Sequence, residues 1–405
     1  MTTLTENRED LLVEGIEPNR ELIARATALR ELIREHAEAG SDAGRVEPVV
    51  MDAMRDAGLL KLTVPQRFGG YETNSRTFVE VLSELAQGDG STAWSAMLLN
   101  IGNWFATTWS GRAQEEIWGD NPDATCCVIL ASGVVGERVE GGYRITGGWP
   151  YASGSFAATH AIVGFLVEGP DGEPVPALGI LQPGEWTVER TWVPIGLKGT
   201  GSDTVRADGI VIPDHRIQLM FDLVEGKYAT EFAPLEARAR APFLATGTII
   251  FGAVQIGLGK AVLEQIVDRV RNKGVVGTAY TVAANSPSHQ ITIARAAAMI
   301  DAAEQLAFRS CRDIDQSAID GEYPNRLLRA RIRNDTGAII ELINDAIDKL
   351  MKAGGSSTFL KTSPLHRIFQ DSFVGGSHVH ATPGVANDVY GKLLLGHTED
   401  LPIHV

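Results

Sequence analysis

The stretch GGYRITGGWPYAS, residues 141–153, has the alternating positions and bounding turn residues of a β-strand. Comparable β-rich runs surround it: ATCCVILAS (124–132), THAIVGFLVEG (159–169) and VPALGILQPG (175–184). We therefore predict a middle β domain over residues 123–235. Because helical patterns lie on both sides of this β domain, the chain combines separate helical and sheet domains.

Before the β domain, apolar residues recur every three or four positions, which predicts helices. The pattern is clearest in residues 21–40, 47–60, 77–87 and 92–109. It predicts an N-terminal α-helical domain over residues 1–122.

After the β domain the helical period returns in residues 243–272, 288–318 and 325–353. Each segment is longer than about 25 residues, which is typical of an antiparallel bundle. We predict a C-terminal helical bundle over residues 236–405, and the fold class is α+β. On the first of these helices Gly252, Gly257 and Gly259 suit the close approach of another helix, either from a second subunit or from the same chain.

Composition excludes several classes of protein. The net charge is −15 and no long cluster of Lys and Arg is present, so we expect no nucleic-acid partner. The N-terminal residues show no export signal, and no apolar stretch approaches the ~18 residues of a membrane span. Cys126, Cys127 and Cys311 have no metal-like spacing and fit a reducing cytoplasm, so we predict neither a disulfide nor a metal site.

The segment TSPLHRIFQDSFVGGSHVH, residues 362–380, carries Arg367, Asp371 and His378 at intervals of four and seven. If it is helical, these side chains lie within an arc of roughly 40°, and His380 points the other way. Arg367 and Asp371 then suit a structural ion pair. His378 suits a base near neutral pH, or equally a packing histidine paired with Asp371.

Five strings, in this order, resemble the acyl-CoA dehydrogenase fold: AGLLKLTVPQRFGGYE (57–72), GDGSTAW (88–94), ITGGWPYASG (145–154), GLKGTGSDTVRADGIVIPDHR (196–216) and PLHRIFQD (364–371). The resemblance runs over nearly the whole chain. It implies an N-terminal helical domain, a β-barrel-like sheet domain and a C-terminal antiparallel four-helix bundle.

Within this fold, GDGSTAW, the W-P-Y-A-S-G string and the histidine seven residues after Asp371 resemble the two-component (group D) flavin-dependent monooxygenases. The resemblance implies an oxygenase component that takes reduced FMN or FAD from a separate NAD(P)H:flavin reductase. With O2 it would hydroxylate an aromatic, polycyclic or similar small organic substrate through a C4a-hydroperoxyflavin. It also implies a cytoplasmic homotetramer. Relatives often carry arginine where this chain has Gln370, so we expect no second cation there.

Neither a G-x-G-x-x-G after a strand nor a P-loop is present, in keeping with no NAD(P)H site in this chain. The resemblance assigns roles as follows. His378 and Ser153 are the catalytic candidates: His378 as a base or as the residue that orients the distal oxygen of the hydroperoxide, and Ser153 as a contact of the flavin. The candidates for contact with the flavin ring are Trp149, Tyr151, Ser153, Thr200 and Ser202, and those for the substrate are Ser91, Trp94 and Trp104. The candidates for the flavin phosphate come from residue chemistry alone: Arg271 for its charge, and Gly354, Gly355 and Ser356 for a turn whose N–H groups and hydroxyls suit an anion.

Ordinary structural roles stay open for several of these residues. Trp149 and Tyr151 share one side of a strand and could be core. Ser91 or Thr92 could simply cap a helix, and residues 199–204 could be a polar turn.

Two other functions also stay open. An acyl-CoA dehydrogenase or flavin oxidase would need a glutamate, and none lies between Asp371 and Asp388 or in residues 243–255. A non-catalytic flavin-binding subunit is the second alternative.

Overall fold

The computed structural model describes residues 15–131, 133–169, 171–399, 401–403 and 405. The expectation of no export signal concerns N-terminal residues that lie mostly outside these ranges. The N-terminal part is helical: α1 (Arg20–Ala28), α2 (Arg30–Ala43), α3 (Pro48–Asp56), α4 (Ser75–Ala86), α5 (Gly90–Ala106) and α6 (Gly111–Trp118). The single helix predicted over residues 21–40 is two helices. The break falls at Leu29, whose backbone N–H donates three residues back, to Ala26 O at 3.1 Å.

The middle part contains two four-stranded sheets, ordered β1-β4-β5-β8 and β2-β3-β7-β6. The strands are β1 (Cys126–Ile129), β2 (Glu137–Val139), β3 (Gly142–Ala152), β4 (His160–Glu168), β5 (Pro174–Leu181), β6 (Thr187–Glu189), β7 (Asp203–Pro213) and β8 (Ile217–Leu219). Apolar side chains from both sheets, such as Ile145, Phe165 and Ile212, form one core between them. The pairing of β3 with β7 shifts register between Trp149 and Ala152, next to the site described below.

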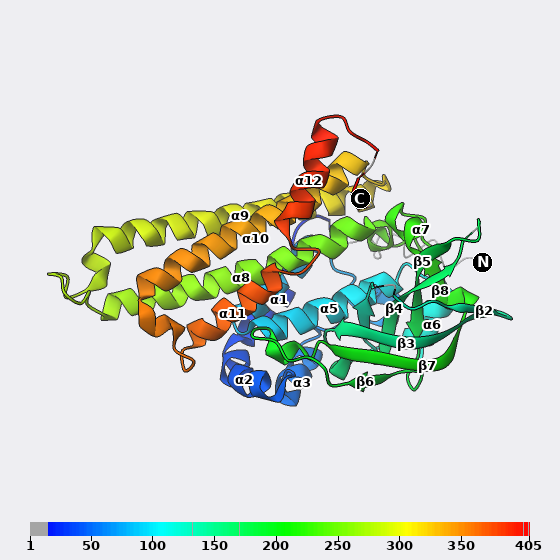
Figure 1. Cartoon of the computed structure of the whole chain (residues 1–405), viewed down its shortest axis with the longest axis horizontal. Coiled ribbons are helices and arrows are strands. Elements are labelled where there is room, and N and C mark those ends of the chain that lie inside the picture. Colours follow the sequence, from blue (N-terminus) through cyan, green and yellow to red (C-terminus); the bar gives the residue numbers. More distant parts are fainter. Residues whose placement is uncertain (1–14, 132, 170, 400, 404) are drawn as a thin grey trace.

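The C-terminal part is a bundle. It contains α8 (Phe243–Asn272), α9 (Pro287–Asp320), α10 (Arg326–Gly354), α11 (Pro364–Gly376) and α12 (Pro383–Leu394), after the short α7 (Met220–Val224). Figure 1 shows α8, α9 and α10 running lengthwise beside one another, with α11 alongside and α12 crossing them. The α+β fold with helical flanks is confirmed.

Helix α8 is the centre of this bundle. It is long and apolar enough to cross a membrane by length and composition, so the statement that no such stretch exists is wrong. However, 83% of its most apolar window is buried inside the protein, as expected for a core helix that is hydrophobic all round.

The glycines of α8 allow other helices of the same chain to approach. A Cβ at Gly257 would lie 2.3 Å from Ser83 O on α4, and one at Gly252 would lie 3.1 Å from Ile339 on α10. Packing within the chain therefore accounts for them, without a second subunit.

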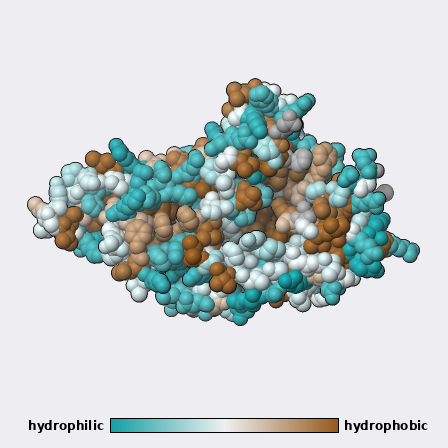
Figure 2. All heavy atoms as spheres, viewed as in Figure 1, coloured by the Kyte–Doolittle hydropathy of each residue, from teal (hydrophilic) through white to brown (hydrophobic). Residues whose placement is uncertain are grey.

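The predicted domain boundaries, 122/123 and 235/236, fall between α6 and β1 and between α7 and α8. They remain predictions. Helices α5 and α8 lie where the bundle meets the sheets (Figure 1), and hydrophobic side chains gather around a hollow there in Figure 2.

Candidate active site

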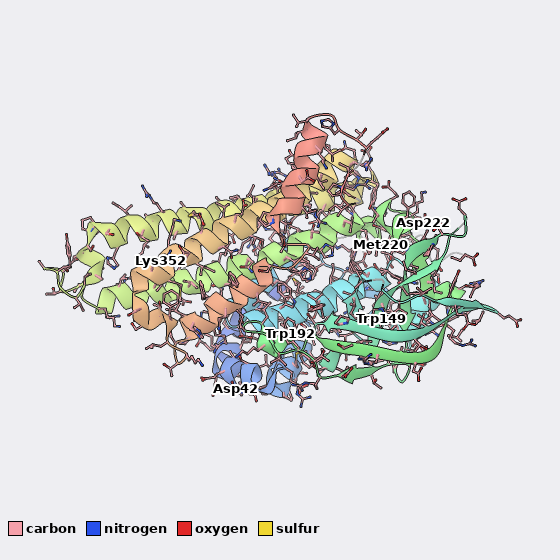
Figure 3. The ribbon with its side chains drawn as sticks, viewed as in Figure 1. Asp42, Trp149, Trp192, Met220, Asp222 and Lys352 are labelled. Atoms are coloured by element: carbon pink, nitrogen blue, oxygen red, sulfur yellow. The ribbon has the colours of Figure 1, made fainter. Side chains whose placement is uncertain are left out.

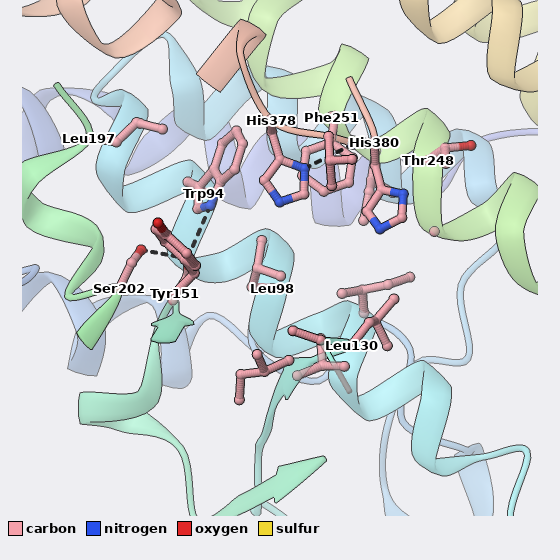
Figure 4. Close-up of a pocket in the computed structure, with 18 of the residues that line it drawn as sticks. Trp94, Leu98, Leu130, Tyr151, Leu197, Ser202, Thr248, Phe251, His378 and His380 are labelled. Atoms are coloured by element: carbon pink, nitrogen blue, oxygen red, sulfur yellow. Dashed lines mark hydrogen bonds between the residues drawn. The ribbon is translucent and has the colours of Figure 1, made fainter. Parts of the chain in front are cut away.

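A cavity of about 470 Å³ lies between α5, the sheets and the C-terminal bundle. Most of the side chains that line it are apolar or aromatic, and they come from α5, β1, the end of β3, the loop before β7, the first half of α8 and residues 374–380. Figure 4 shows its polar members, Ser202 and Trp94 at one end and His378 and His380 farther along. Among the described lining residues there is no aspartate or glutamate.

Buried hydroxyls form a hydrogen-bonded chain at one end of the cavity. The Trp94 indole N–H donates to Ser153 Oγ at 3.3 Å, and Ser153 Oγ lies 2.6 Å from Ser202 Oγ. Ser202 Oγ lies 2.7 Å from Thr200 Oγ1, which donates to Leu197 O at 2.8 Å. Ser153 and Ser202 line the cavity, whereas Thr200 lies one step behind them.

The direction of this chain follows from proton counting, because each hydroxyl has one hydrogen to donate. The Thr200 hydroxyl donates its one hydrogen to Leu197 O, so the bond between Ser202 and Thr200 must use the hydrogen of Ser202. For the same reason the bond between Ser153 and Ser202 uses the hydrogen of Ser153. Ser153 Oγ therefore offers a lone pair, rather than a proton, to a ligand in the cavity.

Two lining residues have backbone conformations that side chains rarely adopt. Tyr151 has φ of 67° and Leu197 has φ of 52°. Such conformations persist only where surrounding contacts enforce them, and they cluster at functional sites. The register shift after Trp149 turns Tyr151 outward, where its ring lies edge-on to Trp192 at 6.0 Å between centroids.

Trp149 and Tyr151 therefore do not share one side of the strand. Trp149 is buried among the strands, and its indole N–H donates to Gly164 O at 2.6 Å. It packs in the core and is not among the residues that line the cavity, whereas Tyr151 lines it. In Figure 3 Trp149 lies within the sheet region, apart from Trp192.

His378 lies in the cavity, but not on the predicted helical stripe. Helix α11 ends at Gly376 and Ser377 caps it, so His378 and His380 belong to the following turn. The turn brings both rings into the cavity, and the expectation that His380 points away is wrong. The His378 ring stacks on Phe251 at 4.4 Å and meets the edge of Trp94 at 5.7 Å between centroids.

Both imidazoles are neutral at physiological pH. Burial, and then the Arg333 charge, lowers the pKa of His378 to about 4. Burial, and then His378 and Arg333, lowers the pKa of His380 to about 3. The backbone N–H of His380 donates to His378 Nδ1 at 3.3 Å, so the proton of neutral His378 is on Nε2. His378 is thus a hydrogen-bond donor toward the cavity. Of the two roles that we predicted for it, this geometry favours orienting an oxygen atom over acting as a base near neutral pKa.

Arg367 and Asp371 both lie at the junction of α11 with the rest of the protein, but with separate partners. Arg367 Nε lies 3.5 Å from Asp89 Oδ1, and Asp371 Oδ1 accepts the backbone N–H of Leu197 at 2.6 Å. The direct pair predicted between them is therefore wrong, because the two side chains bind different elements. Their structural role remains our assignment.

Of the three residues predicted to contact the substrate, one lines the cavity and two do not. Trp94 lines the cavity, whereas Trp104 is fully buried behind Phe105 and Phe243 and donates to Arg238 O at 3.0 Å. Trp104 is therefore not a cavity residue.

Ser91 is not among the residues that line the cavity either; its Oγ accepts the Gly199 N–H at 3.2 Å. The N-cap of α5 is neither Ser91 nor Thr92 but Asp89, whose carboxylate accepts the Thr92 N–H at 2.8 Å.

The phosphate candidates lie elsewhere. A second cavity, at the far end of α8, is lined by Gly354, Gly355, Ser356 and Arg269. The Nε of Arg269 donates to Gly354 O at 2.9 Å. Arg271 is exposed. Along α8, Phe251 and Arg269 are separated by about 27 Å. Figure 3 places Lys352, near this second cavity, at the opposite end of the bundle from Trp149. These residues do not share a cavity with His378.

Sequence reasoning did not identify Phe251, Leu197 and Trp192 as cavity residues, nor His380. Phe251 lies in an apolar helix that carries no signal for a site. A His-x-His pattern in a glycine-rich turn was the one available signal for His380.

The residues present fit a flavin ring. Tyr151, Trp192 and Trp94 offer aromatic faces and edges, and Ser153 and Ser202 offer hydroxyl oxygens at the same end of an otherwise apolar cavity.

Comparisons with known proteins agree with this geometry. The chain matches the acyl-CoA dehydrogenase N-terminal domain over residues 20–118 and the acyl-CoA dehydrogenase C-terminal domain over residues 249–383. It is 30% identical to the oxygenase subunit HsaA of a flavin-dependent monooxygenase from Mycobacterium tuberculosis, covering 89% of this chain and 91% of that protein. It is 28% identical to the oxygenase component of FADH2-dependent resorcinol hydroxylase from Rhizobium sp., covering 94% of this chain and 95% of that protein.

Among solved structures, XiaF from Streptomyces sp. in complex with FADH2 and glycerol superimposes with a TM-score of 0.90 at 28% identity, over 95% of this chain and 96% of that one. The chain therefore belongs to the acyl-CoA dehydrogenase fold family, in the branch formed by the oxygenase components of two-component flavin-dependent monooxygenases.

Proposed function

We propose that this chain is a flavin-dependent oxygenase that hydroxylates a small aromatic substrate in the cavity between α5, α8 and the sheets. The observation that supports this proposal is the lining of the cavity, which has aromatic walls, buried hydroxyls and two neutral histidines. Its described lining residues include no carboxylate. An acyl-CoA dehydrogenase would need such a carboxylate to remove a proton.

Reduced flavin, when bound, supplies two electrons to dioxygen, so that one oxygen atom enters the substrate and the other leaves as water. Ser153 Oγ, whose hydrogen is directed at Ser202, would accept a hydrogen bond from a ring N–H of the reduced flavin. The Nε2–H of His378 would donate to an oxygen atom of a ligand in the cavity. The apolar walls exclude water, which would otherwise divert the reaction.

The flavin is reduced FAD or FMN, delivered by a separate NAD(P)H:flavin reductase in the cytoplasm. Two relatives above 25% identity, the resorcinol hydroxylase component and XiaF, are named with FADH2, which favours FAD.

The protein acts as a homotetramer. The second cavity, with Gly354, Gly355, Ser356 and Arg269, is about 27 Å along α8 from the first. It would therefore serve the flavin phosphates of a neighbouring subunit rather than those of its own. Replacement of Ser356 by alanine should then weaken flavin binding only in the assembled oligomer, as measured by flavin titration and by mass in solution.

The test of the function is product analysis with reduced flavin. The protein is supplied with reduced FAD or FMN, dioxygen and a panel of phenols, and products are identified by mass. Incorporation of one oxygen atom from labelled dioxygen supports the proposal. Oxidation of acyl-CoA thioesters with an artificial electron acceptor would instead identify a dehydrogenase, and flavin binding without either reaction would identify a non-catalytic subunit.

A further inference from the structure

The cavity has two unlike halves. Ser202 and Tyr151 lie at one end, and His378 lies between this end and His380, as Figure 4 shows. Ser153 belongs to the same end, because its Oγ lies 2.6 Å from Ser202 Oγ. Phe251 contacts both histidine rings, at 4.4 Å and 6.1 Å between centroids, whereas of the two histidines Trp94 contacts His378, at 5.7 Å. His380 therefore faces the half farther from the hydroxyl chain.

Most other side chains that line the cavity are apolar, among them Phe105, Val128, Leu130, Phe243, Leu244 and Ile250. Thr248 also lines it, but its hydroxyl already donates to Ala245 O at 3.2 Å. His380 is thus the polar side chain that a ligand in this half would meet.

The His380 ring presents a donor. Its Nδ1 is buried without a hydrogen-bond partner among the described residues. A buried unpaired N–H is rarer than a buried unpaired lone pair. The proton of neutral His380 therefore belongs on Nε2, the nitrogen that remains open to the cavity.

A buried positive charge lies behind this ring. Arg333 on α10 is 6% exposed, and its Nη2 donates to Val379 O at 3.4 Å. In the described part of the chain no carboxylate forms an ion pair with Arg333. The carboxylate nearest to it along α10, Asp335, is paired with Arg309 at 2.5 Å. The charged or titratable groups that act on His380 are His378 and Arg333.

A buried cation without an anion is costly, and an anion bound nearby recovers part of that cost. We propose that His380 binds the hydroxyl oxygen of an aromatic substrate and that Arg333, acting through the turn, favours its phenolate form. His380 is then a substrate-contact residue and Arg333 a positioning residue. The inference rests on the proposed function, because it assigns the farther half of the same cavity to the substrate.

Phenolate is favoured over carboxylate because one N–H is directed at the site. A phenolate spreads its charge over the ring and needs fewer donors, whereas a carboxylate has two oxygens to satisfy. The proton released on binding goes to solvent, because both histidines are too weakly basic to hold it.

The test uses probes that need neither flavin nor dioxygen. A negative binding result would therefore contradict this inference without contradicting the proposed oxygenase function. Binding of 4-nitrophenol, its methyl ether 4-nitroanisole and 4-nitrobenzoate is measured by calorimetry, and the phenolate fraction of bound 4-nitrophenol by absorbance. We expect 4-nitrophenol to bind at least about tenfold more tightly than the ether at neutral pH. Its ionisation midpoint should fall by about one pH unit on binding.

The variants separate the two residues. His380→Phe should remove the preference for the phenol over the ether, His380→Gln should restore part of it, and the exposed control His397→Gln should leave it unchanged. Arg333→Met should abolish the shift in ionisation, and Arg333→Lys should keep it; thermal unfolding shows that each variant is folded. No binding of 4-nitrophenol, tighter binding of 4-nitrobenzoate, or an unchanged preference in His380→Phe would overturn the proposal.

Discussion

The carboxylate of Asp371 on α11 accepts a hydrogen bond from the backbone N–H of Leu197 at 2.6 Å, joining the bundle to the loop that carries Ser202. Leu197 itself is held at φ of 52°. We predict that Asp371→Ala lowers the free energy of unfolding by about 1–3 kcal/mol and weakens reduced-flavin binding. Denaturant unfolding and flavin titration measure both.

The matched control is Asp388→Ala on α12, whose carboxylate is half exposed and pairs with Lys392. Its effect on stability should stay within about 0.5 kcal/mol. Equal effects of the two substitutions would show that the Leu197 contact does not hold the loop.

Stability should depend on pH through Asp371. Burial, and then the Asp89 carboxylate, raises the pKa of Asp371 to about 8. Between its ordinary pKa of about 3.9 and this value, the folded state holds a proton that the unfolded state has released, so the free energy of unfolding falls as pH rises. His378 and His380, with lowered pKa values, act in the opposite direction, but only below about pH 6.5.

Asp371→Asn imitates the protonated carboxyl, so the free energy of unfolding of this variant should depend less on pH above about pH 6.5. We expect the wild-type free energy of unfolding to fall relative to the variant between pH 6.5 and 8, with a slope of up to ~1.4 kcal/mol per pH unit. Denaturant melts across this range measure it. Parallel curves would show that Asp371 is ionised throughout.

The direction of the hydroxyl chain gives a third prediction. Trp94→Phe removes the donor to Ser153 but keeps the later bonds to Ser202 and Thr200, so Ser153 still offers its lone pair. Reduced flavin should therefore bind Trp94→Phe within a few-fold of wild type, whereas Ser153→Ala should bind it about tenfold more weakly. Anaerobic titration measures both. If the order is reversed, Ser153 acts as the donor instead.

A fourth prediction concerns the glycines of α8. A Cβ at Gly257 would lie 2.3 Å from Ser83 O, so Gly257→Ala should lower the free energy of unfolding by about 1–3 kcal/mol. On α12, a Cβ at Gly391 meets nothing within 4 Å, and Gly391→Ala should stabilise by up to about 1 kcal/mol. Thermal melts compare them; similar effects would contradict the packing described.

The sequence predicted the architecture because periodicity records which face of an element is buried. The segments over residues 243–272 and 325–353 became α8 and α10 with almost those bounds. The sequence could not predict that α11 ends at Gly376, because its helical periodicity continues to His378. The turn, not the stripe, brings His378 and His380 together.

The site was harder to predict than the fold. Trp94 and Trp104 lie ten residues apart on one helix, yet one lines the cavity and the other packs behind Phe105. Trp104 also packs against Phe243, which lies on a helix far away in the chain. Likewise, the role of Ser153 depends on Ser202 and Thr200 across a loop, which no local motif records.

The central claim is that His378 serves an oxygenase as a neutral donor, and a single turnover tests it most directly. Protein with anaerobically reduced flavin and a phenolic substrate is mixed with dioxygen across pH 5.5 to 8, and hydroxylated product and hydrogen peroxide are quantified. We predict for wild type a product yield without a rise near pH 6.5, because the pKa of His378 is lowered to about 4. His378→Ala should bind the flavin but release mainly peroxide. A yield that climbs through pH 6 to 7, or equal product from His378→Ala, would contradict the account.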